Sequence, residues 1–80
     1  MIRFTKHGQE AVETRNIAFE WIEATVTSPD STDRDPRYPE RTRSYRAIAA
    51  FGGRVLRVVH RPDGDDILII TVHFDLGGTP

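Results

Sequence analysis

Cysteine is absent from this chain of 80 residues, which excludes a disulfide scaffold, a thiolate metal site and a cysteine nucleophile. Long apolar runs are absent too. The longest, Ile67–Ile70, is far shorter than the roughly 20 residues that a membrane-spanning helix needs. The first residues, Met1–His7, lack the apolar stretch and small-residue cleavage site of a secretory signal. We therefore expect no membrane partner and a cytoplasmic location.

The overall composition is that of an ordinary globular domain. Hydrophobic residues make up 38% of the chain and charged residues 29%, which argues against global disorder. Eighty residues are near the lower limit for a chain that folds alone without disulfides. We expect one domain over residues 1–80, with a loop rich in Pro, Asp and Arg at about residues 28–42.

Charge is segregated along the chain, although the net charge is only −1. Residues 43–61 hold five Arg and no acid, whereas residues 8–40 hold eight acids and three Arg. Ten of the eleven basic residues are Arg, whose planar guanidinium suits bidentate binding of phosphate or carboxylate. A genome rich in G and C would give the same preference for Arg, so the composition leaves both explanations open.

The first half of the chain predicts a short strand followed by two helices. Residues 2–5 alternate apolar and polar side chains, as a strand does. Thr5 is a suitable N-cap for a helix over Lys6–Thr14, and Asn16 is suited to the left-handed position past its end. A second helix is predicted over Ala18–Thr27, because its apolar residues recur on one face.

The second half predicts three antiparallel strands over residues 43–51, 54–61 and 67–74, with Gly52-Gly53 as a two-residue turn. The fold class is therefore α+β: two N-terminal helices packed on one face of a C-terminal antiparallel β-meander. We expect that face to contain Leu56 and Val58.

A two-residue turn fixes which side chains share a face of this hairpin. It places Ala47 opposite Val58 and Tyr45 opposite His60. The other face then carries Arg46 and Arg57 among aliphatic side chains, and a one-residue slip would undo this assignment.

Several short motifs occur in a fixed order along the chain. They are Thr5, His7, Gly8, Ala11, Val12, Arg15, Asn16 and Ile17 in the first helix, then Ser28-Pro29-Asp30, Tyr45-Arg46, Phe51–Val59 and Thr71–Asp75. In this order the chain resembles DUF4258, a family of bacterial domains of unknown function whose first helix typically reads T-x-H-A-x-x-R-M-x-x-R-G-I. Gly8 replaces the usual Ala, and Ala11 replaces a helix Arg whose loss weakens any phosphate site to which it contributes.

The resemblance implies a distant similarity to the RelE and BrnT ribonuclease toxins, which place helices against a small antiparallel sheet and bind RNA with basic residues. This is analogy at the level of fold. It leads us to expect RNA as a partner, cleavage without a metal or other cofactor, and a cognate antitoxin.

RNA cleavage without metal needs a group that takes the 2′-OH proton and cations that hold the phosphate. His7 is the candidate acid or base, because it lies at the helix start in a motif position; the alternative is a packing or capping His. Arg46 and Arg57 are the candidate phosphate clamps, with Arg15 reaching the same cleft from the helix. The alternative for these Arg residues is a solvated surface paired with nearby acids.

Other candidates favour structural roles. His60 opposite Tyr45 suits either an acid-base pair or, preferably, a polar contact at the edge of the core. A metal site made of His7, His60 and His73 lacks any close HxH or HExxH pair. Tyr38 offers a stacking surface for a base, but the acids around it favour a self-neutralised loop.

The sequence therefore leads to two hypotheses. The first is a toxin-like, metal-independent endoribonuclease that acts through His7, Arg46, Arg57 and Arg15 and is neutralised by an antitoxin. The second is a non-catalytic module that uses the Arg-rich sheet face to bind nucleic acid or an acidic protein.

Overall fold

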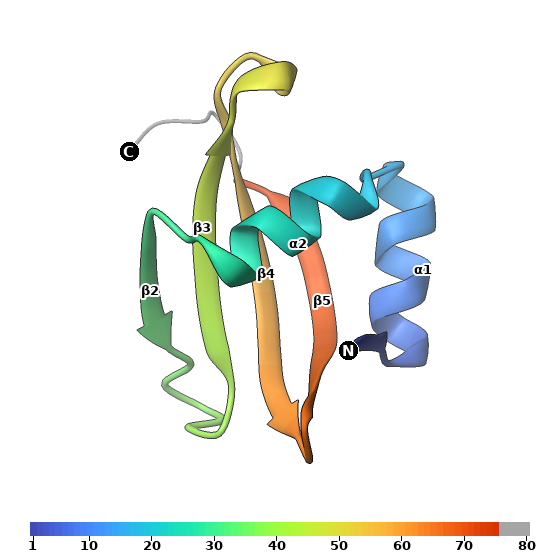
Figure 1. Ribbon diagram of the computed structural model, residues 1–80, viewed down its shortest axis with the longest axis vertical. Helices are drawn as coiled ribbons and strands as arrows, with labels where there is room; N and C mark the ends of the chain where they lie inside the picture. The colour runs from blue at the N-terminus through green and yellow to red at the C-terminus, as the bar shows by residue number, and fades with distance from the viewer. Residues whose placement is uncertain (76–80) are drawn as a thin grey trace.

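In the computed structural model, which describes residues 1–75, two helices pack against one five-stranded sheet (Figure 1). The elements, in chain order, are β1 (Ile2–Phe4), α1 (Lys6–Arg15), α2 (Phe19–Thr27), β2 (Ser31–Arg34), β3 (Thr42–Ile48), the 3-10 turn η1 (Ala49–Phe51), β4 (Arg54–Asp63) and β5 (Asp66–Phe74). The strand order is β1-β5-β4-β3-β2, with β1 parallel to β5 and the other pairs antiparallel. No helix among residues 1–75 is long and apolar enough to cross a membrane.

The predicted signals at both ends of α1 are confirmed. The Thr5 hydroxyl accepts a hydrogen bond from the Gly8 amide at 2.9 Å, which satisfies a free donor of the first turn. Asn16 follows the last helical residue with φ of 53° and ψ of 50°, a left-handed conformation that Asn tolerates better than most residues.

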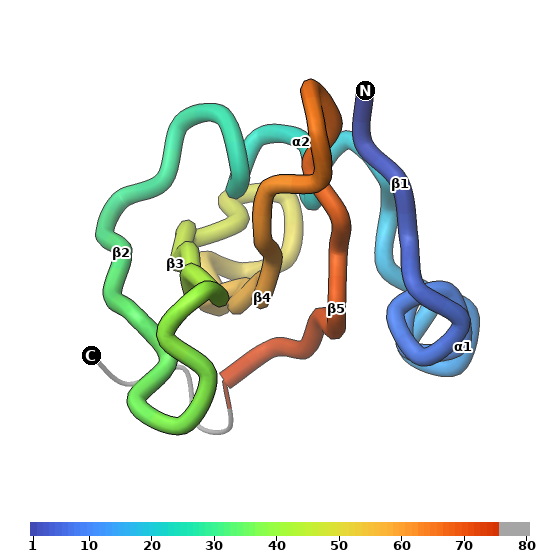
Figure 2. The backbone as a smooth tube through the Cα atoms, turned by 90° about the horizontal axis from the view of Figure 1, so that it is seen from below, coloured from blue at the N-terminus to red at the C-terminus, as the bar shows by residue number. Residues whose placement is uncertain are grey.

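The two helices contact different parts of the sheet. α2 crosses β3 and β4, whereas α1 runs beside β5 near the edge formed by β1 (Figures 1 and 2). Gly8 permits the close approach of α1, because a β-carbon at this position would lie 2.5 Å from the Ile69 carbonyl oxygen. Any larger residue there would push the helix away from the strand.

The core lies between the sheet and the two helices, with α2 over β3 and β4 and α1 beside β5. Leu56 and Val58 are fully buried, as predicted, and Ile22 of α2 packs with them. The other buried members of this cluster are Ala11, Ile17, Ile48, Ile69 and Val72. We call the side of the sheet that faces away from α2 the outer face.

The predicted three-stranded meander is too small, because two edge strands extend it. β1 forms the edge beside β5, and its parallel pairing makes the sheet mixed. β2 lies inside the predicted loop at residues 28–42, where it pairs with β3. All four residues of β2 are exposed, so this strand carries no buried hydrophobic pattern from which it would be predicted.

The predicted register of β3 against β4 is wrong. Ala47 lies opposite Val55 instead of Val58, a shift of three residues. The connection is longer than two residues, because η1 precedes Gly52-Gly53 and the Gly53 amide donates to the Ile48 carbonyl at 2.9 Å. An odd shift exchanges the two faces of a strand, so Arg46 moves to the α2 side while Arg57 stays on the outer face.

Candidate nucleic-acid interface

The outer face of the sheet brings together three polar side chains from neighbouring strands. Arg57 of β4 lies directly opposite His73 of β5 and, on its other side, opposite Tyr45 of β3. His73 lies between Val72 and Phe74, which belong to the core side, so alternation turns its imidazole to the outer face. All three side chains are only partly buried, which leaves them accessible to a ligand.

The surroundings of His73 lower the pKa of its imidazole and so favour the neutral form. Burial lowers the pKa of its imidazole below the usual value, and the positive charges of Arg57 and Arg15 lower it further, against an opposing effect of Asp75. The imidazole is therefore a proton acceptor held beside cations.

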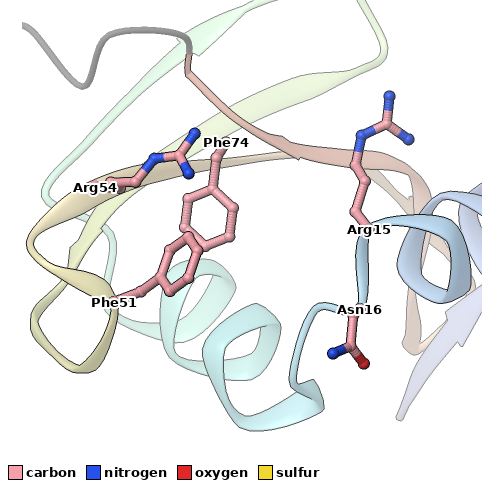
Figure 3. Close-up of a pocket in the computed structure, with 5 residues that line it drawn as sticks. All are labelled: Arg15, Asn16, Phe51, Arg54 and Phe74. Carbon is pink, nitrogen blue, oxygen red and sulfur yellow. The ribbon is translucent and has the colours of Figure 1, made fainter.

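Arg15 approaches this group from the end of α1. Its charge acts on His73, although the two residues are 58 positions apart in the chain. Its side chain is exposed, and Figure 3 shows its guanidinium pointing away from the neighbouring Asn16. Arg15 and Arg57 thus place two cations around one imidazole.

The arginines of the described chain divide into three groups, one of which binds backbone carbonyls or the neighbouring Glu40 and consists of Arg34, Arg41 and Arg61. Arg3, Arg43 and Arg46 have Asp partners at 3.1, 2.6 and 3.9 Å. By contrast, the guanidinium groups of Arg15, Arg37, Arg54 and Arg57 make no ion pair and no hydrogen bond with any residue among 1–75. We call Arg15, Arg54 and Arg57 the unpaired arginines, because these three surround the end of β5.

Arg57 is the most constrained of the unpaired arginines. Its Nε atom is buried and has no hydrogen-bond partner in the described chain. A buried cationic donor without a partner is unfavourable. The two terminal nitrogens of its guanidinium are not buried in this way, and they are the atoms that an anionic ligand on the outer face would reach.

Arg46 does not join this group, so the predicted clamp of Arg46 with Arg57 is wrong. Arg46 lies opposite Leu56, which is fully buried on the α2 side. Its guanidinium donates to the Ser28 carbonyl at 2.5 Å and lies 3.9 Å from Asp30. The two guanidinium groups therefore project from opposite faces of the sheet.

His7 also lies apart from the unpaired arginines. It is exposed in the first turn of α1, and Arg15 is the last residue of that helix. At about 1.5 Å of rise per residue, the two lie about 12 Å apart along the helix axis. Of the four predicted site residues, Arg57 lies directly opposite His73, and Arg15 is near enough for its charge to act on that imidazole.

His60 has the structural role favoured from the sequence, although with a different partner. It lies on the α2 side and its Nε2 is 2.8 Å from the Ser44 hydroxyl, which is almost fully buried. Burial lowers the pKa of His60. Tyr45 instead directs its hydroxyl to the Asp33 carboxylate, at 3.4 Å from the nearer oxygen.

Two further expectations concern the loop and metal binding. Arg41 stacks over Tyr38 with its guanidinium carbon 4.2 Å from the ring centroid, so the exposed tyrosine already has an intramolecular partner. Among residues 1–75, no three His, Cys, Asp or Glu side chains gather closely enough to hold a metal ion.

Sequence reasoning considered His73 only as a metal ligand and missed its place beside Arg57. A signal was present, because His73 lies within the Thr71–Asp75 motif and alternates with apolar residues along its strand. That pattern indicates an outer-face position. It does not indicate which residue of the neighbouring strand lies opposite.

The comparisons with known proteins assign the family. Residues 4–74 match the family described as "Domain of unknown function (DUF4258)". Because the match covers most of the chain, the protein belongs to this family. No curated protein and no solved structure matches the chain.

Proposed function

We propose that this protein is a metal-independent endoribonuclease that cleaves single-stranded RNA on the outer face of its sheet. The observation that carries the proposal is the position of His73 directly opposite Arg57 on the outer face, with Arg15 near enough for its charge to act on the imidazole; neither arginine has an ion-pair partner among residues 1–75. His73 thereby takes the place of His7 as the expected proton acceptor.

The chemistry follows from these groups. A neutral His73 accepts the proton of a ribose 2′-OH, and the 2′ oxygen attacks the adjacent phosphorus. The bond from phosphorus to the 5′ oxygen breaks, and this oxygen takes a proton from water. The products are a 2′,3′-cyclic phosphate and a 5′-OH end, and His73 returns its proton to the solvent.

Arg57 and Arg15 would stabilise the negative charge of the reacting phosphate. Negative charge grows on the phosphate oxygens during attack, and preorganised cations stabilise that charge more than they stabilise the bound substrate. The terminal guanidinium nitrogens of Arg57 have no partner among residues 1–75 and are not buried, so they can bind phosphate oxygens. Arg15 contributes a second cation from a separate element, which allows the two to hold different oxygens.

The proposal keeps two further hypotheses from the sequence. One is the likeness of this fold to the RelE and BrnT toxins, which is analogy alone. The other is a cognate antitoxin, which would neutralise the enzyme by covering the outer face around Arg57 and supplying acidic groups there.

Cleavage of a labelled single-stranded RNA in the presence of a metal chelator tests the proposal. Wild-type protein is expected to leave 2′,3′-cyclic phosphate ends, and His73→Ala to lower the rate by about 100-fold or more, the usual scale for proton transfer. His7→Ala is the matched control, because it removes an exposed imidazole elsewhere, and it is expected to retain the wild-type rate. Thermal unfolding of both variants shows whether they are folded.

Two outcomes would contradict the proposal in different ways. If wild-type protein freed of any partner binds RNA but leaves it intact, the protein is the non-catalytic binding module, for which the unpaired arginines are equally suited. If folded His73→Ala cuts at full rate while His7→Ala does not, the original choice of His7 is right.

A further inference from the structure

An aromatic cavity lies next to the unpaired arginines. Its walls are formed by Arg15, Asn16, Phe51, Arg54 and Phe74 (Figure 3). The cavity has a volume of about 370 Å³, within the range of roughly 300 to 1,000 Å³ typical of small-molecule sites. None of the five lining residues is acidic.

The aromatic wall presents flat surfaces to this cavity. The Phe51 and Phe74 rings lie 4.8 Å apart at 39°, and Trp21 packs behind them at 5.7 Å from Phe51 and 6.0 Å from Phe74. Phe51 nevertheless remains 41% exposed. An exposed ring that is backed by two others has a fixed position, so its exposed part can stack on a base once the Arg54 guanidinium, 5.2 Å from its centroid, moves onto the base.

The polar groups around the rings match a nucleotide rather than an apolar ligand. The guanidinium carbon of Arg54 lies 5.2 Å from the centroids of both Phe51 and Phe74, where it can stack on a base or bind a phosphate. Asn16, which lines the cavity, presents an amide with both a donor and an acceptor.

Arg15 connects the cavity with the proposed catalytic group. It lines the cavity and also lies close enough to His73 to lower the pKa of that imidazole. A strand whose phosphate is held between Arg15 and Arg57 would therefore have the next base at the mouth of the aromatic cavity. His73 and Phe74 are consecutive residues on opposite faces of β5. The RNA would therefore pass around the end of β5.

The geometry points to a nucleobase subsite: the cavity binds one base of single-stranded RNA by stacking on Phe51, with Arg54 and Arg15 holding its flanking phosphates. This inference rests on the proposed function only in taking RNA as the ligand. It adds that the protein recognises an unstacked base, so duplex RNA is a poor ligand.

Binding of a short 2′-O-methyl RNA tests the subsite without any need for cleavage, because this probe lacks the attacking hydroxyl. Trp21 is the single tryptophan of the chain and contacts both phenylalanines, so its fluorescence should change on binding. Phe51→Leu is expected to weaken binding roughly 5- to 150-fold, the equivalent of one stacked base. Phe51→Tyr, which keeps the ring, is expected to bind like wild type.

A probe with one abasic site, moved along the strand, provides a test that leaves the protein unchanged. One position is expected to weaken binding as much as Phe51→Leu does, and that variant should be insensitive to the missing base. Asn16→Gly keeps the left-handed turn and removes the amide, so it should reduce any preference among the four bases.

These results separate the subsite from catalysis. Equal binding by wild-type protein and folded Phe51→Leu, or equal binding of every abasic probe, would overturn the subsite while leaving cleavage through His73 intact. Tight, stacking-dependent binding by a protein that leaves RNA uncut would sustain the subsite and refute the proposed activity. Absence of any binding to the probe would overturn the subsite, and the cleavage assay with unmodified RNA would then decide the proposed activity separately.

Discussion

Two regions of the sheet carry arginines in different electrostatic settings. In the paired region, on β2 and β3, Arg43 binds Asp33 through two hydrogen bonds of 2.6 and 2.9 Å, and Arg46 lies near Asp30. In the unpaired region, around the end of β5, Arg15, Arg54 and Arg57 have no acidic partner among residues 1–75.

This difference separates structural arginines from candidate ligand-binding ones. The carboxylate of Asp33 already occupies the guanidinium fork of Arg43, and the same bond lowers the pKa of Asp33. An anion that approaches Arg43 would have to displace that carboxylate. An anion that approaches Arg57 meets terminal guanidinium nitrogens that have no hydrogen-bond or ion-pair partner among residues 1–75. A cluster of Arg in the sequence therefore says less about ligand binding than the side chains with which each Arg pairs in the structure.

The largest expected effect comes from exchanging one arginine of each region for alanine. Arg57→Ala should slow RNA cleavage by about 100- to 1,000-fold, the scale for loss of one group that stabilises transition-state charge. Arg43→Ala should leave the rate nearly unchanged, because its charge is already neutralised by Asp33. Single-turnover rates measure both, with thermal unfolding as the check on folding. Equal losses in the two variants would remove the distinction between the regions.

The pH dependence of cleavage should also depend on the unpaired region. His73 must be neutral to accept a proton, so kcat/KM should fall as the pH drops through its lowered pKa. Arg57→Met removes one of the charges that lower this pKa, so the acidic limb should move to higher pH. NMR titration of the imidazole checks the assignment. A limb that stays in place in Arg57→Met would show that the titrating group is not His73.

The stability of the fold should also decrease as the pH falls, because of His60, a histidine that lies outside both regions. Burial lowers the pKa of His60 in the folded state, so below the unfolded value of about 6.5 the unfolded chain binds more protons. The free energy of unfolding therefore has its highest value above that pH, and it decreases as the pH falls below it.

His60→Gln should flatten this dependence, as measured by urea unfolding at several pH values. His73, whose pKa is also lowered, should retain part of it. His7→Gln, which replaces an exposed residue, is the control and should keep the full slope. A slope that is unchanged in His60→Gln would contradict the assignment.

The smallest effect is expected from a substitution that leaves Arg43 of the paired region without its acidic partner. Asp33→Asn removes the carboxylate that neutralises Arg43 on the outer face. The plot of log affinity for single-stranded RNA against log salt should steepen by about 0.7, the contribution of one additional phosphate contact. Binding of a labelled oligonucleotide over a range of salt concentrations measures this slope. An unchanged slope would place Arg43 outside the path of the RNA.

Much of the local structure was predictable from the sequence. Thr5 and Asn16 mark the two ends of α1, and Leu56 and Val58 lie in the core as expected. These features depend on side chains within a few positions of each other, or on simple alternation. The edge strand β2 was not predictable, because all of its residues are exposed and only its pairing with β3 makes it a strand.

The candidate site was only partly predictable, for the same reason. The sequence predicts Arg15 and Arg57 as binding cations, and in the structure the charges of both act on the His73 imidazole. His7 and Arg46 were selected with them but lie elsewhere, and His73 was overlooked. Each of these errors depends on which residues the fold places side by side, and the list of residue types does not contain that information.

By itself, the sequence determined the helix boundaries, the apolar face of β4 and the presence of a cationic segment, because these depend on local backbone preferences and periodicity. The register between β3 and β4, and with it the face of every arginine on β3, was decided only by the tertiary structure. Phe51 packs against Trp21 and Phe74, which are distant in the chain. With the 3-10 turn η1 in the connection, the strands pair with an odd shift, and an odd shift exchanges the two faces.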